Sequence, residues 1–379
     1  MGVFGEFNLG RKDIRVTVLV WTGFVALVLL ILAFDLGIFS RESKTLSAKV
    51  ALFRVGVYFV LALCFTVFVY FAYEFHLFDL GIAGPIDDPG LPDSGWEAAV
   101  QFFSGYILEQ SLSVDNIFVI ALILGYFKVP AEYQNRVLLW GILGALVMRG
   151  VMIGIGAALI KFVNPITYFF GAFLIFTAYK MLVSDDDDEV DFEKNFLVRT
   201  ARRLFRMHPE FVQDHFFTRI DGKLAMTPLL LALAVVETTD LVFAVDSIPA
   251  VFGLTSDPFL VFTSNVFAVL GLRSLYFALA DLLGRFHLLK YSLVIILAFV
   301  GAKMLLEKLV IPHDQDSKAI VNVVSFAVIV VTLFGGIVAS FIYPDKPAPE
   351  EERLEEKTLE GKEAQHPPEQ SELQTHDQV

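Results

Sequence analysis

Long apolar runs, repeated along the whole chain, constrain this sequence more than any other feature. Each run is about 20 residues long, the length that an α-helix needs to cross the hydrocarbon core of a bilayer. Because 56% of the 379 residues are apolar and only 19% are charged, composition also indicates a polytopic, all-α membrane protein. We expect about nine transmembrane spans, near residues 15–39, 51–73, 97–124, 136–159, 165–183, 227–253, 259–280, 289–309 and 319–343.

The distribution of Lys and Arg predicts the orientation of these spans. Cytoplasmic loops retain positive charge, and most of the Lys and Arg fall in polar segments on one side, with the N-terminus on the other. We therefore expect the N-terminus outside and the C-terminus in the cytoplasm. The net charge of −13 does not indicate an acidic soluble surface, because many of the acids lie in the run at 184–193 and in the tail after Pro344.

Two stretches of the chain are similar to each other, which indicates an internal repeat. "EQSLSVDNI" at 109–117 matches "DLVFAVDSI" at 240–248, and Arg149 and Lys180 then align with Arg273 and Lys303. Each copy contains three spans. Because that number is odd, the two copies should enter the membrane from opposite sides, as the inverted repeats of secondary transporters do.

The repeats divide the chain into six expected regions. Two of them are the three-span repeats, and the others are flanking spans, a charged loop and a tail. They are 1–95 (two spans and an external loop), 96–183 (first repeat), 184–226 (cytoplasmic charged loop), 227–310 (second repeat), 311–343 (final span) and 344–379 (disordered cytoplasmic tail).

Ionisable residues inside the spans mark the candidate site, because a charge in the bilayer is costly unless it faces protein or water. Acids without Cys or His favour a hard, oxygen-preferring divalent cation. The candidate metal ligands are Glu109, Asp115, Asn116, Glu237, Asp240, Asp246 and Ser247, and the supporting charge partners are Arg149, Arg273 and Asn265. We expect the arginines to pair with the acids more readily than they touch the substrate.

Helical geometry separates these candidates into two faces. Positions seven apart share a face, so Glu109 lies with Asn116 and Asp240 with Ser247, whereas the acid six residues on points away in each copy. One unbroken helix cannot aim every acid at one ion. We expect a kink at Pro249 in the second copy; in the first copy, either the helix is distorted near 111–113 or the acid pairs with an arginine.

Two further residues carry simpler expectations. Asp35 lies at the end of a span and should be interfacial. The single cysteine, Cys64, cannot form an internal disulfide and is expected to be a small core residue.

The motifs resemble a known family. "SLSVDN", "VVETTDLVFAVDSIPAVF" and "TSNVFAVLGLRSLYF" look like the TerC family of bacterial integral membrane proteins, and "FDLGIFSRESKTLSAKVAL" resembles its Alx-like branch. The resemblance runs from about residue 16 to 343. It implies location in the bacterial cytoplasmic membrane, metal-ion homeostasis with a tellurium-resistance association, Mn²⁺ export as the activity, and an ion site at 109–116 and 237–247.

These observations favour a secondary transporter that exports divalent metal ions, most readily Mn²⁺, with protons as the expected counter-ion. The expected partners are therefore the metal ion, protons and the lipid bilayer, with no nucleic acid and no prosthetic group. The alternative is a membrane scaffold for a metal or tellurite stress-response complex, in which the intramembrane acids are structural. An enzyme is disfavoured, because duplicated acids with Asn and Ser neighbours suit ion passage better than one asymmetric active site.

Overall fold

The computed structural model describes residues 11–39, 48–81, 91–162, 166–183, 206–208, 210–220, 223–279, 288–310 and 315–343. The acidic run at 184–193 and the tail at 344–379, expected to be solvated and disordered, lie outside these residues.

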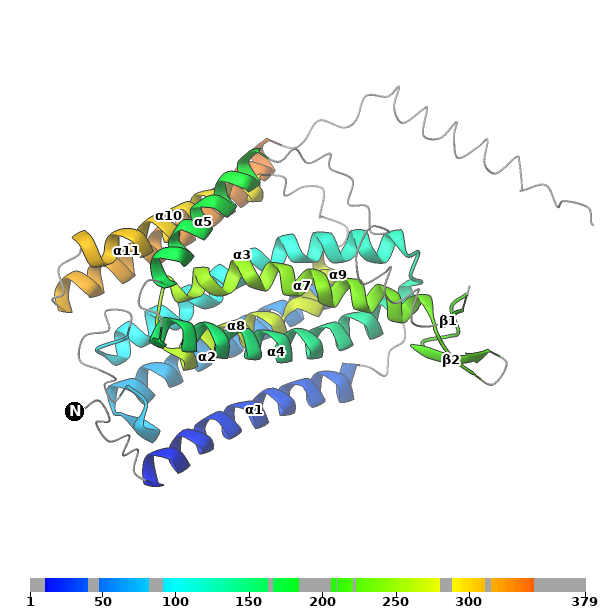
Figure 1. The fold of residues 1–379 in the computed structure, drawn as a ribbon, viewed down its shortest axis with the longest axis horizontal. Coiled ribbons are helices and arrows are strands. Elements are labelled where there is room, and N and C mark those ends of the chain that lie inside the picture. Colours follow the sequence, from blue (N-terminus) through cyan, green and yellow to red (C-terminus); the bar gives the residue numbers. More distant parts are fainter. Residues whose placement is uncertain are drawn as a thin grey trace, which may run out of the picture.

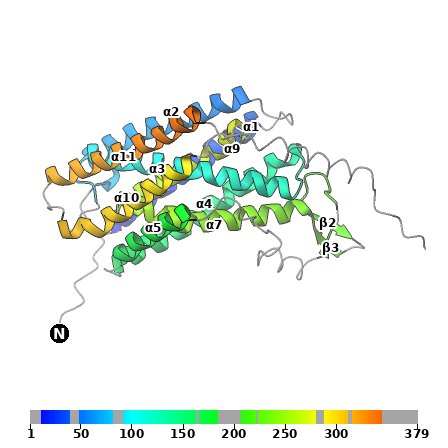
Figure 2. The same cartoon turned by 90° about the horizontal axis from the view of Figure 1, so that it is seen from above.

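Long helices account for nearly all of the described chain (Figures 1 and 2). Eight helical windows are long and apolar enough to cross a membrane, and the membrane part is therefore all-helical and polytopic, as predicted. The remaining expected span, 289–309, coincides with a further helix of 22 residues. The long helices are α1 (Arg11–Phe39), α2 (Ala48–Glu74), α3 (Gly95–Tyr126), α4 (Ala131–Phe162), α5 (Ile166–Val183), α7 (Pro228–Phe252), α8 (Pro258–Leu270), α10 (Leu289–Val310) and α11 (Gln315–Ile342). The 3₁₀ turn η1 (Leu77–Asp79) follows α2, and the short helix α9 (Leu272–Leu279) follows α8.

The seventh span is broken where no break was predicted. It begins with Pro258 after the N-cap Asp257, whose carboxylate accepts the backbone N–H groups of Phe259 and Leu260. It then breaks at Gly271, so that α8 and α9 are separate helices. Helix α7 continues through Pro249, and α3 is one helix from Gly95 to Tyr126; the kink at Pro249 stays a prediction.

The helices form a central group, with α1 on one side of it and α5, α10 and α11 on the other (Figure 1). In the centre, α3 packs against α8 and α4 packs against α7, while α2 packs against α3 and α9. Helices α5, α10 and α11 lie together obliquely to this group. Because 89% of the window across α8 and α9 is buried, against 11% for α11, this broken span lies at the centre of the bundle.

Two glycines bring α5 and α10 into close contact. A Cβ atom at Gly171 would lie 2.9 Å from the carbonyl oxygen of Gly301, and one at Gly301 would lie 2.8 Å from that of Gly171. Small residues of this kind let membrane helices approach backbone to backbone. The pair therefore joins the third helix of one expected repeat to the third helix of the other.

A small sheet follows the 184–205 segment, in a region expected to be a loop. Its strands, β1 (Arg206–Met207), β2 (Phe217–Ile220) and β3 (Lys223–Met226), have the order β1-β3-β2; β1 is parallel and β2 antiparallel to β3. It lies against the start of α4, where Arg136 pairs with Asp214. Since β3 leads directly into α7, both α4 and α7 start at this end of the bundle (Figure 2).

Two residues with simpler expectations have unexpected surroundings. Asp35 is buried in protein: it is only 8% exposed, and its carboxylate accepts a hydrogen bond from Nη1 of Arg273 on α9 at 3.1 Å. Its expected place at the membrane interface stays a prediction. Cys64 is exposed on the outer face of α2 rather than packed in the core, because the inward positions of that helix are taken by Ala62 and Phe65.

The Asp35–Arg273 pair should stabilise the attachment of α1. Arg273→Met should lower the free energy of unfolding by about 3 kcal/mol, because it leaves a buried carboxylate without its partner. The double variant Asp35→Leu/Arg273→Met should recover most of that loss, since neither charge is then buried alone. Melting temperatures of the purified wild type, both single variants and the double variant measure the coupling.

Arg136→Met is the matched control, because its ion pair with Asp214 is more than one-third exposed on both sides and should contribute little. Equal melting temperatures for Arg273→Met and Arg136→Met would contradict a stabilising role for the buried pair.

Candidate functional site

A buried guanidinium group lies at the centre of the candidate site. Arg149, in the middle of α4, is 2% exposed, and the two acids beside it, Glu109 on α3 and Asp240 on α7, are 0% and 8% exposed. Charges so far from water are retained only where they are paired. Each of the three lies within a largely apolar helix, on the side that is buried in the bundle.

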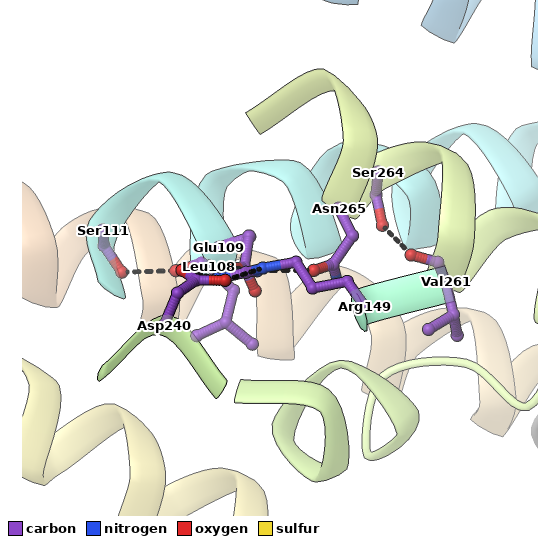
Figure 3. A network of polar contacts seen from close by, with 8 residues as sticks. All are labelled: Leu108, Glu109, Ser111, Arg149, Asp240, Val261, Ser264 and Asn265. Atoms are coloured by element: carbon purple, nitrogen blue, oxygen red, sulfur yellow. Dashed lines mark hydrogen bonds and ion pairs between the residues drawn. The ribbon is translucent and has the colours of Figure 1, made fainter. Parts of the chain in front are cut away.

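Four hydrogen bonds connect Arg149 to three other helices (Figure 3). Its Nε and Nη2 atoms donate to the two carboxylate oxygens of Asp240, at 3.3 Å and 3.1 Å, which is the two-pronged geometry that guanidinium and carboxylate groups prefer. Nη1 donates to Oε1 of Glu109 and, at 2.7 Å, to Oδ1 of Asn265 on α8. One side chain therefore ties α3, α4, α7 and α8 together.

The two repeat-matched acids meet at this arginine. Glu109 and Asp240 begin the two similar stretches of sequence, and α3 packs against α7. Two carboxylates and one guanidinium leave one net negative charge, so the group retains an attraction for cations. Of the residues singled out from the sequence, Glu109, Arg149, Asp240 and Asn265 are in direct contact.

Buried polar atoms around this group have no partner among the described residues. They include Oε2 of Glu109 and Nδ2 of Asn265 in the group itself, and Oγ of Ser113, Nδ2 of Asn116 and Oγ of Ser247 along the same helices. Glu109, Ser113 and Asn116 share one face of α3. Buried groups of this kind normally bind water or an ion, and three of these five atoms are oxygens that a hard cation could use.

The other predicted acids lie around the group rather than in it. Asp246 is half-buried and accepts a hydrogen bond from Oγ1 of Thr177 on α5 at 3.3 Å, so it faces the oblique group of helices. Glu237 is half-buried against α4, with its carboxylate in the space that a Cβ atom at Gly144 would need. The side chain of Asp115 lies outside the described residues.

Arg273 does not belong to this group. It was expected to pair with the central acids, but its carboxylate partner is Asp35 of α1. The two arginines that align in the sequence therefore have different partners. Arg149 contacts α3, α7 and α8, whereas Arg273 contacts α1.

Some polar residues near the site were not anticipated. Thr177 contacts Asp246, and Gln101 and Ser104 are buried on α3 with side-chain atoms that have no partner among the described residues. Their positions in the sequence could have identified Gln101 and Ser104: they are three apart within an apolar span, so they share a helix face.

Within the described residues, no three His, Cys, Asp or Glu side chains are close enough together to hold a metal ion. The contacts of Arg149 explain why the central acids do not form such a cluster, because its guanidinium group lies between Glu109 and Asp240. The assignment of these residues as metal ligands stays a prediction.

Comparison with known proteins places this chain in a family. The integral membrane protein TerC family matches residues 94–348, which include both acid motifs. The "Uncharacterized membrane protein STKORF319" of Myxococcus xanthus is 42% identical over 323 residues, covering 85% of this chain and 92% of that protein. The "Putative membrane-bound redox modulator Alx" of Escherichia coli (strain K12) is 43% identical over 291 residues, covering 76% and 86%.

A plant protein is also similar, and it covers a shorter region. The "Thylakoid membrane protein TERC, chloroplastic" of Arabidopsis thaliana is 48% identical over 209 residues, or 55% of this chain and 54% of that protein. No solved structure matches the chain. The family match covers more than half of the chain and the Alx relative aligns over most of its own length, so this protein belongs to the integral membrane protein TerC family.

Proposed function

We propose that this protein is a secondary transporter that exports a divalent metal ion, Mn²⁺ by preference, from the cytosol in exchange for protons. The observation that carries the proposal is the meeting of Glu109 and Asp240, two acids from matched sequence motifs, in a buried group that keeps one net negative charge. Unpartnered oxygens of Glu109, Ser113 and Ser247 supply further ligands of the hard type.

The directions of the helices support an inverted repeat. The starts of α4 and α7 lie at the end of the bundle that carries the sheet, so α3 runs toward that end and α7 runs away from it (Figure 1). Tyr276 of α9 donates a hydrogen bond to Gln134 of α4, which brings the end of the second repeat's broken span back to the sheet. Corresponding helices of the two proposed repeats therefore run in opposite directions.

The packing partners agree with the same proposal. If a two-fold axis exchanges α3, α4 and α5 with α7, α8–α9 and α10, then α3 against α8 must be matched by α4 against α7, and α5 must pack against α10. These are the principal contacts in the bundle. In transporters of this architecture the substrate site lies between the repeats, which is where Glu109, Arg149 and Asp240 meet.

The printed name of the Alx relatives suggests redox modulation, and the sequence limits how this chain could take part in it. With Cys64 as its one cysteine, the chain cannot form an internal disulfide or a dithiol pair. A redox effect of this protein would therefore follow from the metal ions that it moves rather than from its own thiols.

Transport by the proposed site can be measured in inside-out vesicles that contain a Mn²⁺-sensitive dye, with an imposed pH gradient. The wild type should accumulate Mn²⁺ in the vesicles. Glu109→Gln and Asp240→Asn should each reduce the initial rate by at least about tenfold, because each removes half of the negative charge that attracts the ion. Collapse of the pH gradient should lower accumulation by the wild type.

Asp214→Asn is the matched control. Asp214 pairs with Arg136 at the surface, and its side chain is 45% exposed. Its replacement should leave the rate of Mn²⁺ uptake unchanged. Absence of Mn²⁺ uptake by the wild type, or full uptake by both site variants, would overturn the proposed function.

A second candidate function, a membrane scaffold for a stress-response complex, is favoured by one feature of the sequence. The family match ends at residue 348, and the segment that follows is rich in Glu, Pro and Gln. Segments of that composition serve as docking sites for partner proteins. In this alternative the central ion pairs only stabilise the helix bundle.

Deletion of residues 345–379 separates the two functions. A transporter should keep its Mn²⁺ flux, since every residue of the candidate site lies before residue 310, whereas a scaffold should lose its cellular phenotype. Growth of a deletion strain in Mn²⁺, complemented by the full-length or the shortened chain, is the measurement. Complementation by the shortened chain would contradict the scaffold.

A further inference from the structure

We propose that the guanidinium group of Arg149 is a tethered competitor of the transported cation. This group lies between Glu109 and Asp240, and it must leave that position before a divalent cation can bridge the two carboxylates. This inference rests on the proposed function, because it assigns a role to Arg149 within the same site.

The contacts of Arg149 are those that an oxygen-preferring cation would make. Its acceptors are one oxygen of Glu109, both oxygens of Asp240 and the amide oxygen of Asn265 (Figure 3). Carboxylate and amide oxygens are also the side-chain ligands of Mn²⁺, Mg²⁺ and Ca²⁺. The guanidinium group therefore bonds to four of the oxygens that an ion between the two acids would use, and Oε2 of Glu109 is left without a partner within the described part of the chain.

Burial prevents the two cations from sharing the site. Arg149, Glu109 and Asp240 are all less than 9% exposed, so few water molecules screen the charges, and a guanidinium group next to a divalent ion would be strongly repelled. With Arg149 in place the group carries one net negative charge. With a divalent cation in its place the two carboxylates are neutralised, and the displaced guanidinium group, still attached to α4, loses both carboxylate partners.

The competition also connects ion binding to helix packing. Arg149 links α4 to α3, α7 and α8 through its four hydrogen bonds. An ion that takes its place would bind Glu109 and Asp240 itself, so α3 and α7 would stay connected through the ion. Helix α4 would lose its bonds to both acids. Occupancy of the site by the ion therefore changes which helices are held together, as alternating access requires.

Competition predicts that Mn²⁺ binds more tightly when the competitor is removed. The apparent affinity of the wild type is reduced by the fraction of time that Arg149 occupies the site. Arg149→Ala should therefore bind Mn²⁺ at least about tenfold more tightly. Equilibrium dialysis of Mn²⁺ against the purified full-length protein measures this change.

Chemical replacement of the side chain provides an independent measurement. Guanidinium ion at millimolar concentration, below denaturing levels, should enter the space left in Arg149→Ala and weaken its Mn²⁺ binding. It should leave the wild type unchanged, because the tethered group already occupies that space. In vesicles, Arg149→Ala should export more slowly than the wild type, since the bound ion is no longer displaced.

The matched control is the double variant Asp35→Leu/Arg273→Met, which removes the other buried arginine–aspartate pair. Its Mn²⁺ affinity should equal that of the wild type. If Arg149→Ala does not fold, Arg149→Lys takes its place: a single ammonium group cannot bond to both carboxylates as the guanidinium fork does, so Mn²⁺ should again bind more tightly than to the wild type.

The outcomes separate this inference from the proposed function. Mn²⁺ binding to the wild type with equal or weaker binding to the folded Arg149 variant would overturn the competitor role and leave the transporter intact. Failure of guanidinium ion to affect Arg149→Ala would do the same. If neither protein bound any divalent cation, both proposals would be overturned.

Discussion

The interaction on which this bundle depends is the pairing of Arg149 with Glu109 and Asp240. An isolated Asp or Arg at the centre of a membrane helix costs about 3 kcal/mol on insertion scales, so three such residues are retained only if they satisfy one another. Their contacts require that α4 lie between α3 and α7 and that α8 bring Asn265 alongside. The apolar surfaces of the helices then pack around this arrangement, which explains why α8 is buried on nearly all sides.

The same pairing distinguishes the two halves of the chain. Arg149 and Arg273 occupy matched places in the sequence, yet one contacts both central acids and the other contacts Asp35 on α1. A perfectly symmetric site would hold two guanidinium groups and two carboxylates, and it would have no net charge to attract a cation. Because Arg273 pairs with Asp35 instead, the central group of Glu109, Asp240 and Arg149 keeps one net negative charge.

Periodicity and composition were sufficient to predict the helices, because each span is a long apolar run whose length matches the bilayer. The acids at the centre could be identified for the same reason, since a charge in such a run has few structural explanations. The ion-pair partners of the buried charged side chains were harder to predict. Asp35 lies near the end of its run, and only the structure shows that it is buried and bonded to Arg273 of α9. The small sheet did have a signal, Asp221-Gly222 between two short β-prone segments, which is typical of a two-residue hairpin.

A site that exchanges one cation for another also changes its net charge during the transport cycle. In the proposed mechanism Arg149 stays attached to α4 when the ion displaces it, so its charge counts in both states. Glu109, Asp240 and Arg149 together carry one net negative charge without the ion and one net positive charge with it. Moving a charged site across a bilayer costs more than moving a neutral one, so the empty transporter should return more readily with one additional small cation. A proton meets that requirement, and Glu237, half-buried within one helical turn of Asp240, is placed to carry it. In the proposed mechanism, proton exchange needs no counter-ion site apart from these residues.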